Sequence, residues 1–279
     1  MLSISHRWGL GLVLGASAAA ASAAAASAAD GDWLTIEGDY LIGASVVSGN
    51  GHVGDAPVRY DFKPMWAFQL GPFRVSRSRA SSLLKAGREE LETGVSADFG
   101  IFNDWRLGAS LRMDNGRDSG DDPRFSGLPD IPSTLRARIS TGSALGEHWS
   151  WTTSIDKDLL GRRGGSRLAA GLNYRHPLTE HSYWDFGLGA TYGDKTYLQT
   201  HYGITPETAE RVGRSPYTLS SGWENVRASA QYTHVLSEHW VLFGGLDLSR
   251  MLSSPSRSPL VGRKTTHSIS AGIAFRGKR

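Results

Sequence analysis

Cysteine is absent from all 279 residues, which excludes disulfide bonds, a thiolate nucleophile and a zinc site built on sulfur ligands. After Asp30, no stretch approaches the roughly 18 uninterrupted apolar residues that a membrane-spanning helix needs. A mean hydropathy of −0.30 likewise excludes a bundle of such helices. The net charge of +3 is spread along the chain without a basic block, so we expect no nucleic-acid partner.

Catalytic signatures are also absent from the sequence. It contains no Gly-x-Ser-x-Gly elbow, no His-Glu-x-x-His pair and no phosphate-binding loop. We therefore expect no catalytic residue, no cofactor and no metal. The nearest candidates for a lipid hydrolase are Ser253, His267 and His201. A lone histidine beside a membrane is more often a polar surface residue than a general base.

The N-terminus has the pattern of a secretory signal. His6 and Arg7 provide a polar, positive start, and an apolar, alanine-rich stretch follows. Ser27-Ala28-Ala29 then places small residues where signal cleavage requires them. The alternative is an uncleaved membrane anchor, which this cleavage site and the alanine and serine composition disfavour. We expect residues 1–29 to be a cleaved signal peptide and residues 30–279 to form the mature domain.

Apolar residues recur with period two in many segments, and 34 glycines favour turns over helices. The pattern is clear in Trp105–Met113, Trp184–Tyr192 and Trp223–Val235. Successive side chains of a strand point to opposite faces, so each segment has one apolar and one polar surface. Many segments run about ten residues, the length of a tilted strand that crosses a bilayer. Sandwich strands average roughly five or six.

The links between these segments alternate in length. We predict strands near 33–46, 64–70, 73–79, 89–101, 104–114, 133–145, 148–157, 166–177, 182–196, 222–236, 239–251 and 264–276. Short turns such as Ser237-Glu238 alternate with long loops such as Tyr197–Ser221. Outer-membrane barrels are built in this way, with their short turns in the periplasm. The sequence therefore predicts a closed antiparallel up-and-down transmembrane β-barrel of about 12 strands over residues 30–279, with long extracellular loops.

Tryptophan recurs where strands begin after the short turns. Trp105, Trp149, Trp184 and Trp240 occupy equivalent positions in four hairpins. Tryptophan prefers the membrane interface, because its ring is apolar while its N–H can stay hydrated. We expect these four rings to form a periplasmic aromatic girdle in contact with outer-membrane lipids.

Charged residues fall on the polar side of the predicted strands, and facing lipid would cost roughly 2–4 kcal/mol for an arginine near the midplane. We therefore expect them to point into the lumen. They could form a network of salt bridges that fills the interior, which we favour, or line a water-filled pore. The candidate lumen charges are Glu90, Glu92, Asp98, Arg106, Arg112, Arg136, Arg138, Asp156, Arg167, Arg175, Asp185, Arg227 and Asp247.

The loop Tyr197–Ser221 is the most distinctive stretch of the sequence. Thr205 is suited to an N-cap, and Pro206 to the first position of a short helix. This loop could be a lid or plug, a partner-binding surface, or an ordinary ordered loop.

At this loop the sequence resembles the MltA-interacting protein family, also called MipA/OmpV. The resemblance is carried by the run Asp194–Thr200 and by Tyr202, Gly203, Ile204, Thr205 and Pro206. It continues through Trp240, Gly244-Gly245, Ser258–Val261 and Ser270–Phe275. The family usually ends on an aromatic residue, whereas four residues follow Phe275 here.

The resemblance implies a non-enzymatic envelope scaffold whose partner is a lytic transglycosylase or another murein enzyme. Two alternatives remain open from the residues themselves. One is a small porin-like solute channel, and the other is a lipid-modifying barrel enzyme.

Overall fold

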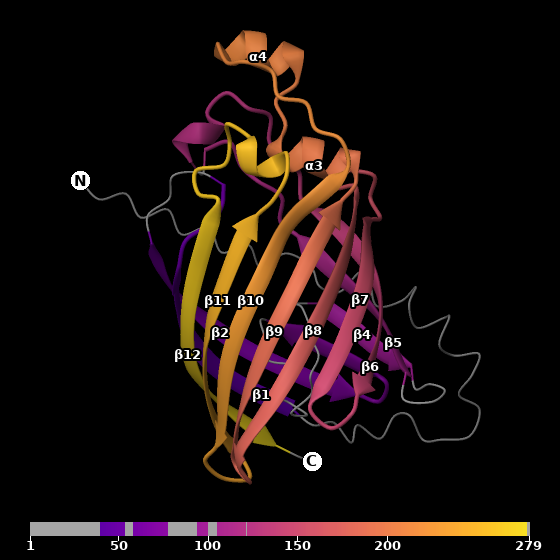
Figure 1. Cartoon of the computed structure of the whole chain (residues 1–279), viewed down its shortest axis with the longest axis vertical. Coiled ribbons are helices and arrows are strands. Elements are labelled where there is room, and N and C mark those ends of the chain that lie inside the picture. Colours follow the sequence, from indigo (N-terminus) through magenta and orange to yellow (C-terminus); the bar gives the residue numbers. More distant parts are fainter. Residues whose placement is uncertain (1–39, 54–57, 78–93, 100–104, 121, 278–279) are drawn as a thin grey trace. The chain divides into compact units, whose positions relative to one another are not determined.

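The computed structural model describes residues 40–53, 58–77, 94–99, 105–120 and 122–277. In this part of the chain, twelve strands form one closed antiparallel barrel (Figure 1). Each strand pairs with the next in sequence, and β12 pairs with β1 to close the sheet. The strands are β1 Tyr40–Gly49, β2 Arg59–Leu70, β3 Phe73–Arg77, β4 Gly94–Phe99, β5 Trp105–Asp114, β6 Thr134–Leu145, β7 Trp149–Asp158, β8 Ser166–Thr179, β9 Ser182–Gly193, β10 Gly222–Val235, β11 Trp240–Met251 and β12 Thr265–Gly277.

The predicted closed barrel and its strand number are confirmed. One predicted strand is too long, because β9 ends at Gly193 rather than at residue 196 and a helix follows. Another is too short, because β2 continues through Pro64 back to Arg59. Pro64 lies opposite Ala44 of β1, and the described residues of β3 pair with Trp66–Leu70 of β2. Residues 33–39, 78–79, 89–93 and 100–101 of the predicted strands lie outside the described residues.

The alternation of side chains divides the wall into two surfaces. Apolar residues at outward positions are exposed, as for Leu188 (62 %), Ile139 (57 %) and Ile269 (57 %). Inward positions carry glycine, serine, threonine and the charged residues. An exposed apolar band around a closed sheet is the surface that a lipid bilayer covers.

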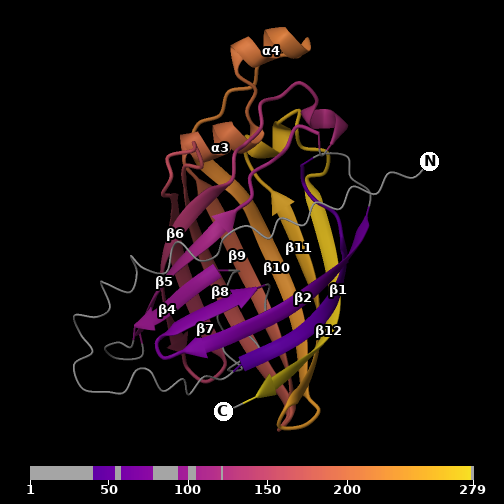
Figure 2. The same cartoon turned by 180° about the vertical axis from the view of Figure 1, so that it is seen from behind.

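The long loops gather at one end of the barrel, hereafter the long-loop end, and the other end is the short-turn end. The long-loop end carries helices α3 (Lys195–Tyr202) and α4 (Pro206–Val212) and the 3-10 turns Pro123–Phe125 and Pro255–Arg257. Figure 2 shows these elements together beyond the strand ends. No helix among the described residues is long and apolar enough to span a membrane.

Two apolar clusters hold the long loops together. One contains Phe125, Leu128, Ile204, Ala209 and Leu260, which come from three different loops. The other contains Tyr197, Leu198, Tyr202, Leu219 and Met251. Because Val53 and Tyr217 pack against both clusters, the loops form one small core, hereafter the cap.

If the outward face contacts lipid, Leu188→Arg should destabilise the barrel in a bilayer by about 2–4 kcal/mol, because a guanidinium near the midplane loses its hydration. Leu160→Arg is the matched control, since Leu160 is also exposed (51 %) but lies in the loop after β7. Unfolding by denaturant in lipid vesicles measures both. Equal costs for the two variants would show that the band is not covered by lipid.

Candidate functional site

The interior of the barrel contains a cavity of about 470 Å³. The structure places six of the candidate lumen charges around it, namely Arg106, Arg138, Asp156, Arg167, Arg227 and Asp247. Arg112 and Arg136 face each other at inward positions of β5 and β6, and Arg175 pairs with Asp185 between β8 and β9. Glu90 and Glu92 lie outside the described residues, as does the side chain of Asp98.

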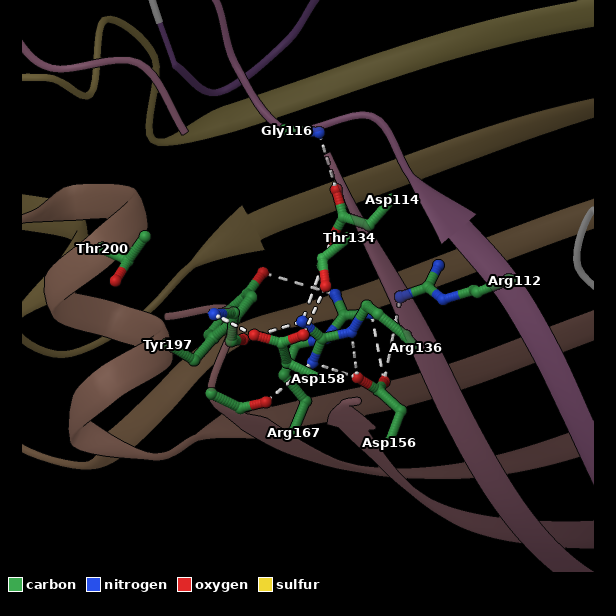
Figure 3. A network of polar contacts seen from close by, with 12 residues as sticks. Arg112, Asp114, Gly116, Thr134, Arg136, Asp156, Asp158, Arg167, Tyr197 and Thr200 are labelled. Atoms are coloured by element: carbon green, nitrogen blue, oxygen red, sulfur yellow. Dashed lines mark hydrogen bonds and ion pairs between the residues drawn. The ribbon is translucent and has the colours of Figure 1, made fainter. Parts of the chain in front are cut away.

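Asp156 is the centre of the largest charged network, although it is only 2 % exposed. Arg136 donates to its Oδ1 from Nε at 2.7 Å and also from Nη2 (Figure 3). Arg167 and Arg138 donate to Oδ2 at 3.1 and 3.3 Å, and Arg112 Nη2 lies 3.9 Å from that atom. A buried carboxylate is tolerated when such charge-assisted hydrogen bonds replace its hydration.

Arg136 extends this network to the loop that follows β7. Its fully buried guanidinium donates from Nη1 to the carbonyl oxygen of Gly164 at 2.7 Å. The adjacent Asp158 accepts hydrogen bonds from the hydroxyl of Thr134 and from the N–H of Gly164. A Cβ at residue 164 would lie 2.9 Å from Asp158 and 3.0 Å from Arg136, so this loop requires glycine.

Arg167 links the network to helix α3 in the cap. Its Nη1 donates to the hydroxyl of Tyr197 at 3.3 Å, and its guanidinium lies 5.1 Å from the centre of that ring. The hydroxyls of Tyr197 and Tyr202 both donate to Oε1 of Glu224, at 3.0 and 2.6 Å. Burial raises the pKa of both tyrosines, so their hydroxyls remain protonated donors.

Helix α3 was not predicted from the sequence, although Asp194 carries a signal for it. Its carboxylate caps the helix by accepting from the N–H of Tyr197 at 2.7 Å, and it also accepts from the N–H of Ser166 at 2.8 Å. Close packing of α3 on the wall depends on Gly165, where a Cβ would lie 2.3 Å from the Tyr197 nitrogen. The strand prediction ran past Gly193 because the alternating pattern was extended into this capped turn.

The family-motif residues connect the two helices of the cap. Tyr202 ends α3, and a Cβ on Gly203 would collide with the side chain of Gln199. Thr205 caps α4 by accepting from the N–H of Thr208, and Pro206 occupies the first turn, which confirms the predicted short helix. The hydroxyl of Ser258 donates to the carbonyl oxygen of Tyr202 at 2.6 Å, which joins the β11–β12 loop to the motif.

The candidate residues for lipid hydrolysis have different environments. His201 is partly buried in α3 beside Tyr197, with ring centres 4.5 Å apart, and its loss of hydration lowers its pKa to about 4. It is therefore neutral near pH 7, and its place in the cap is not on the lipid face. His267 is exposed on β12, and Ser253 has a positive φ of 49° in the β11–β12 loop.

The inward face becomes apolar at the short-turn end. Leu41, Met65, Ala67, Val241 and Ala274 pack together with exposures between 0 and 2 %. These residues come from β1, β2, β11 and β12. Side chains that line an open aqueous pore would be accessible to water, so the inward face of these four strands is dry at this end.

The four girdle tryptophans lie near the short-turn end. Trp105, Trp149 and Trp240 are 49, 44 and 45 % exposed, and Trp184 is half-buried. Each ring packs against an aromatic ring of a nearby strand, at centre distances from 4.8 to 5.3 Å; the partner of Trp105 lies two strands away, across β6, and the other three lie on adjacent strands. The partners are Trp151, Tyr174, Tyr232 and Phe275 respectively for Trp105, Trp149, Trp184 and Trp240.

Asp156→Ala should destabilise the barrel by about 3–5 kcal/mol, because it leaves the buried guanidinium of Arg136 and three partly buried guanidiniums without their shared carboxylate. Asp247→Ala is the matched control and should cost about 1 kcal/mol, since its partner Arg227 has a side chain 40 % exposed to water. Denaturant unfolding in micelles compares the two. A cost for Asp156→Ala no greater than that of the control would contradict the central role of this carboxylate.

Comparisons with solved structures find distant barrels. The NanC porin has a TM-score of 0.44 at 8 % identity, over 84 % of this chain and 98 % of that chain. The CymD monoaromatic hydrocarbon channel has a TM-score of 0.41 at 8 % identity, over 88 % and 90 %. OmpT of Vibrio cholerae has a TM-score of 0.39 at 6 % identity, over 86 % and 97 %. Similarity at this level carries no inference about what the chain does.

A search of curated proteins finds no match. Residues 42–277, in contrast, match the family described as MltA-interacting protein MipA, and this range extends from β1 to the last residue of β12. The chain is therefore an outer-membrane β-barrel that belongs to the MltA-interacting protein MipA family.

Proposed function

We propose that the protein is a non-enzymatic envelope scaffold that holds a murein enzyme, such as a lytic transglycosylase, at the outer membrane. The single observation that carries this proposal is that packed side chains occupy part of the lumen at both ends. The Asp156 network and the cap occupy the long-loop end, and the Leu41 cluster occupies the short-turn end. The family description names an interaction with MltA, which supplies the class of partner.

In this proposal the short-turn end faces the periplasm, where the murein lies. Short turns at the periplasmic rim are typical of outer-membrane barrels. The tryptophans near this end are suited to the corresponding membrane interface. The first 29 residues would act as the signal peptide that exports the chain.

The docking surface would be formed by the β8–β9 and β10–β11 hairpins, which reach furthest at the short-turn end (Figure 1). Leu178 and Leu236 are 50 and 53 % exposed at these hairpins. The hairpins are joined, because the N–H of Val235 donates to the carbonyl oxygen of His181 at 2.7 Å. Both leucines lie closer to the turns than Trp184 and Tyr232, so they would extend beyond the girdle toward a partner.

A photo-crosslinking residue tests this docking surface in cells that make the full chain. Placed at Leu236, it should capture a murein enzyme, because an exposed apolar side chain beside the periplasm is available to a partner. Placed at Arg211, which is exposed on α4 at the opposite end, it should capture none. Capture of a murein enzyme at neither position, or at Arg211 instead, would overturn the proposal.

A solute channel is the second candidate, and the cavity of about 470 Å³ favours it. The two candidates differ at the short-turn end, and the absence of cysteine allows single thiols to report on it. Ala274→Cys should resist a water-soluble thiol reagent in the folded barrel, because Ala274 is 0 % exposed. Ser237→Cys, in the exposed β10–β11 turn, is the matched control and should react. Rapid labelling of both positions would favour the channel.

A further inference from the structure

Ionised side chains are rare on the outward face of the barrel and share one sign. At the outward register positions of the described strands they are Arg77, Lys157 and Arg250. Lys157 and Arg250 are exposed, and each is the second-last residue of its strand at the long-loop end, whereas Arg77 lies opposite Trp66, four residues from the start of β3 at the short turn. The exposed turns of the opposite end carry Glu147, Glu180 and Glu238 instead. The two rims therefore differ in charge.

These rim cations differ from five arginines inside the barrel that are paired with carboxylates, namely Arg136, Arg138, Arg167, Arg175 and Arg227. Within the described part of the chain, Lys157 and Arg250 form no side-chain hydrogen bond or ion pair. The same holds for Lys195 and Lys264, which are exposed just beyond β9 and just before β12. Their charges are thus available to an anion from outside the protein.

Arg250 lies on the outward face of β11, between β10 and β12, in the region hereafter called the rim patch. It is opposite Val226 of β10 on one side and Thr265 of β12 on the other. Lys264 is exposed at the same rim, immediately before Thr265, and its carbonyl oxygen accepts from the N–H of Met251, the residue after Arg250, at 2.8 Å.

Two aromatic rings lie on β10 and β9, on the side of Arg250 away from β12. Trp223 is 50 % exposed, and its ring meets that of Tyr192 edge-to-face at 5.6 Å. This outward pair has the chemistry of a membrane-interface anchor. The rim patch therefore consists of Lys195, Trp223, Tyr192, Arg250 and Lys264. Its cations lie at the long-loop ends of the strands, at the level expected for lipid headgroups.

We propose that the rim patch binds the phosphate groups of a phosphorylated glycolipid in the leaflet around the long-loop end. A guanidinium can bind phosphate oxygens in a bidentate manner, and the flanking ammonium groups add attraction. Trp223 and Tyr192 would pack against the sugar and the upper acyl chains. This inference is independent of the scaffold role, because it concerns the other end and the outer wall of the barrel.

Native mass spectrometry of the full chain in micelles tests the proposal with a bis-phosphorylated glycolipid and its dephosphorylated counterpart. The wild type should retain the phosphorylated form, and the double variant Arg250→Gln/Lys264→Gln should retain it about tenfold less. The charge-matched control Arg211→Gln/Arg257→Gln removes two exposed cations from the cap and should change retention by less than about twofold. The swapped variant Arg250→Lys/Lys264→Arg keeps both positive charges and one guanidinium in the rim patch, so it should bind like the wild type.

Three results would overturn the proposal. Equal retention of phosphorylated and dephosphorylated lipid would show that phosphate is not recognised. Equal losses in the rim and cap variants would show a general effect of net charge. Displacement of the lipid by millimolar inorganic phosphate would indicate a site for the free anion rather than for a lipid headgroup.

Discussion

The buried carboxylate of Asp156 is the interaction on which the long-loop half of the molecule depends. It brings together guanidiniums from β5, β6 and β8, which would otherwise repel one another inside the wall. Through Arg136 it orders the loop after β7, and through Arg167 it reaches Tyr197 of α3. Glu224 then holds both tyrosines of that helix. One acidic residue thus connects the strands, a loop and the cap.

The side chains packed at the two ends of the lumen differ in chemistry. At the long-loop end, charged and hydroxyl groups satisfy one another, which gives a specific arrangement of α3 at the barrel mouth. At the short-turn end, aliphatic side chains exclude water without directional bonds. The cavity lies between these regions, and its lining carries charges of both signs. This arrangement supports a barrel whose partners act on its rims rather than through its interior.

Much of the fold could be predicted because a barrel strand has a simple pattern. Outward positions must be apolar and inward positions can be polar, so Leu188 and Asp185 reveal the faces of β9 from the sequence alone. The predicted helix at Thr205 and Pro206 depended on local capping chemistry, which is also visible in the sequence.

Features that depend on distant contacts could not be predicted. Leu41 and Met65 are apolar residues at inward positions. They are apolar there because they pack against residues of β11 and β12. Glu224 was overlooked because its two tyrosine donors are 27 and 22 residues away in sequence. Single-residue alternation also could not separate a salt-bridge network from a pore, because both need charges at the same inward positions.

The proposed scaffold role requires that the lumen does not conduct solute. Planar-bilayer recording of the purified full chain tests it most directly. The account predicts no discrete conductance steps for the wild type across a range of voltages and salt concentrations. Reproducible single-channel openings of the wild-type barrel would contradict it.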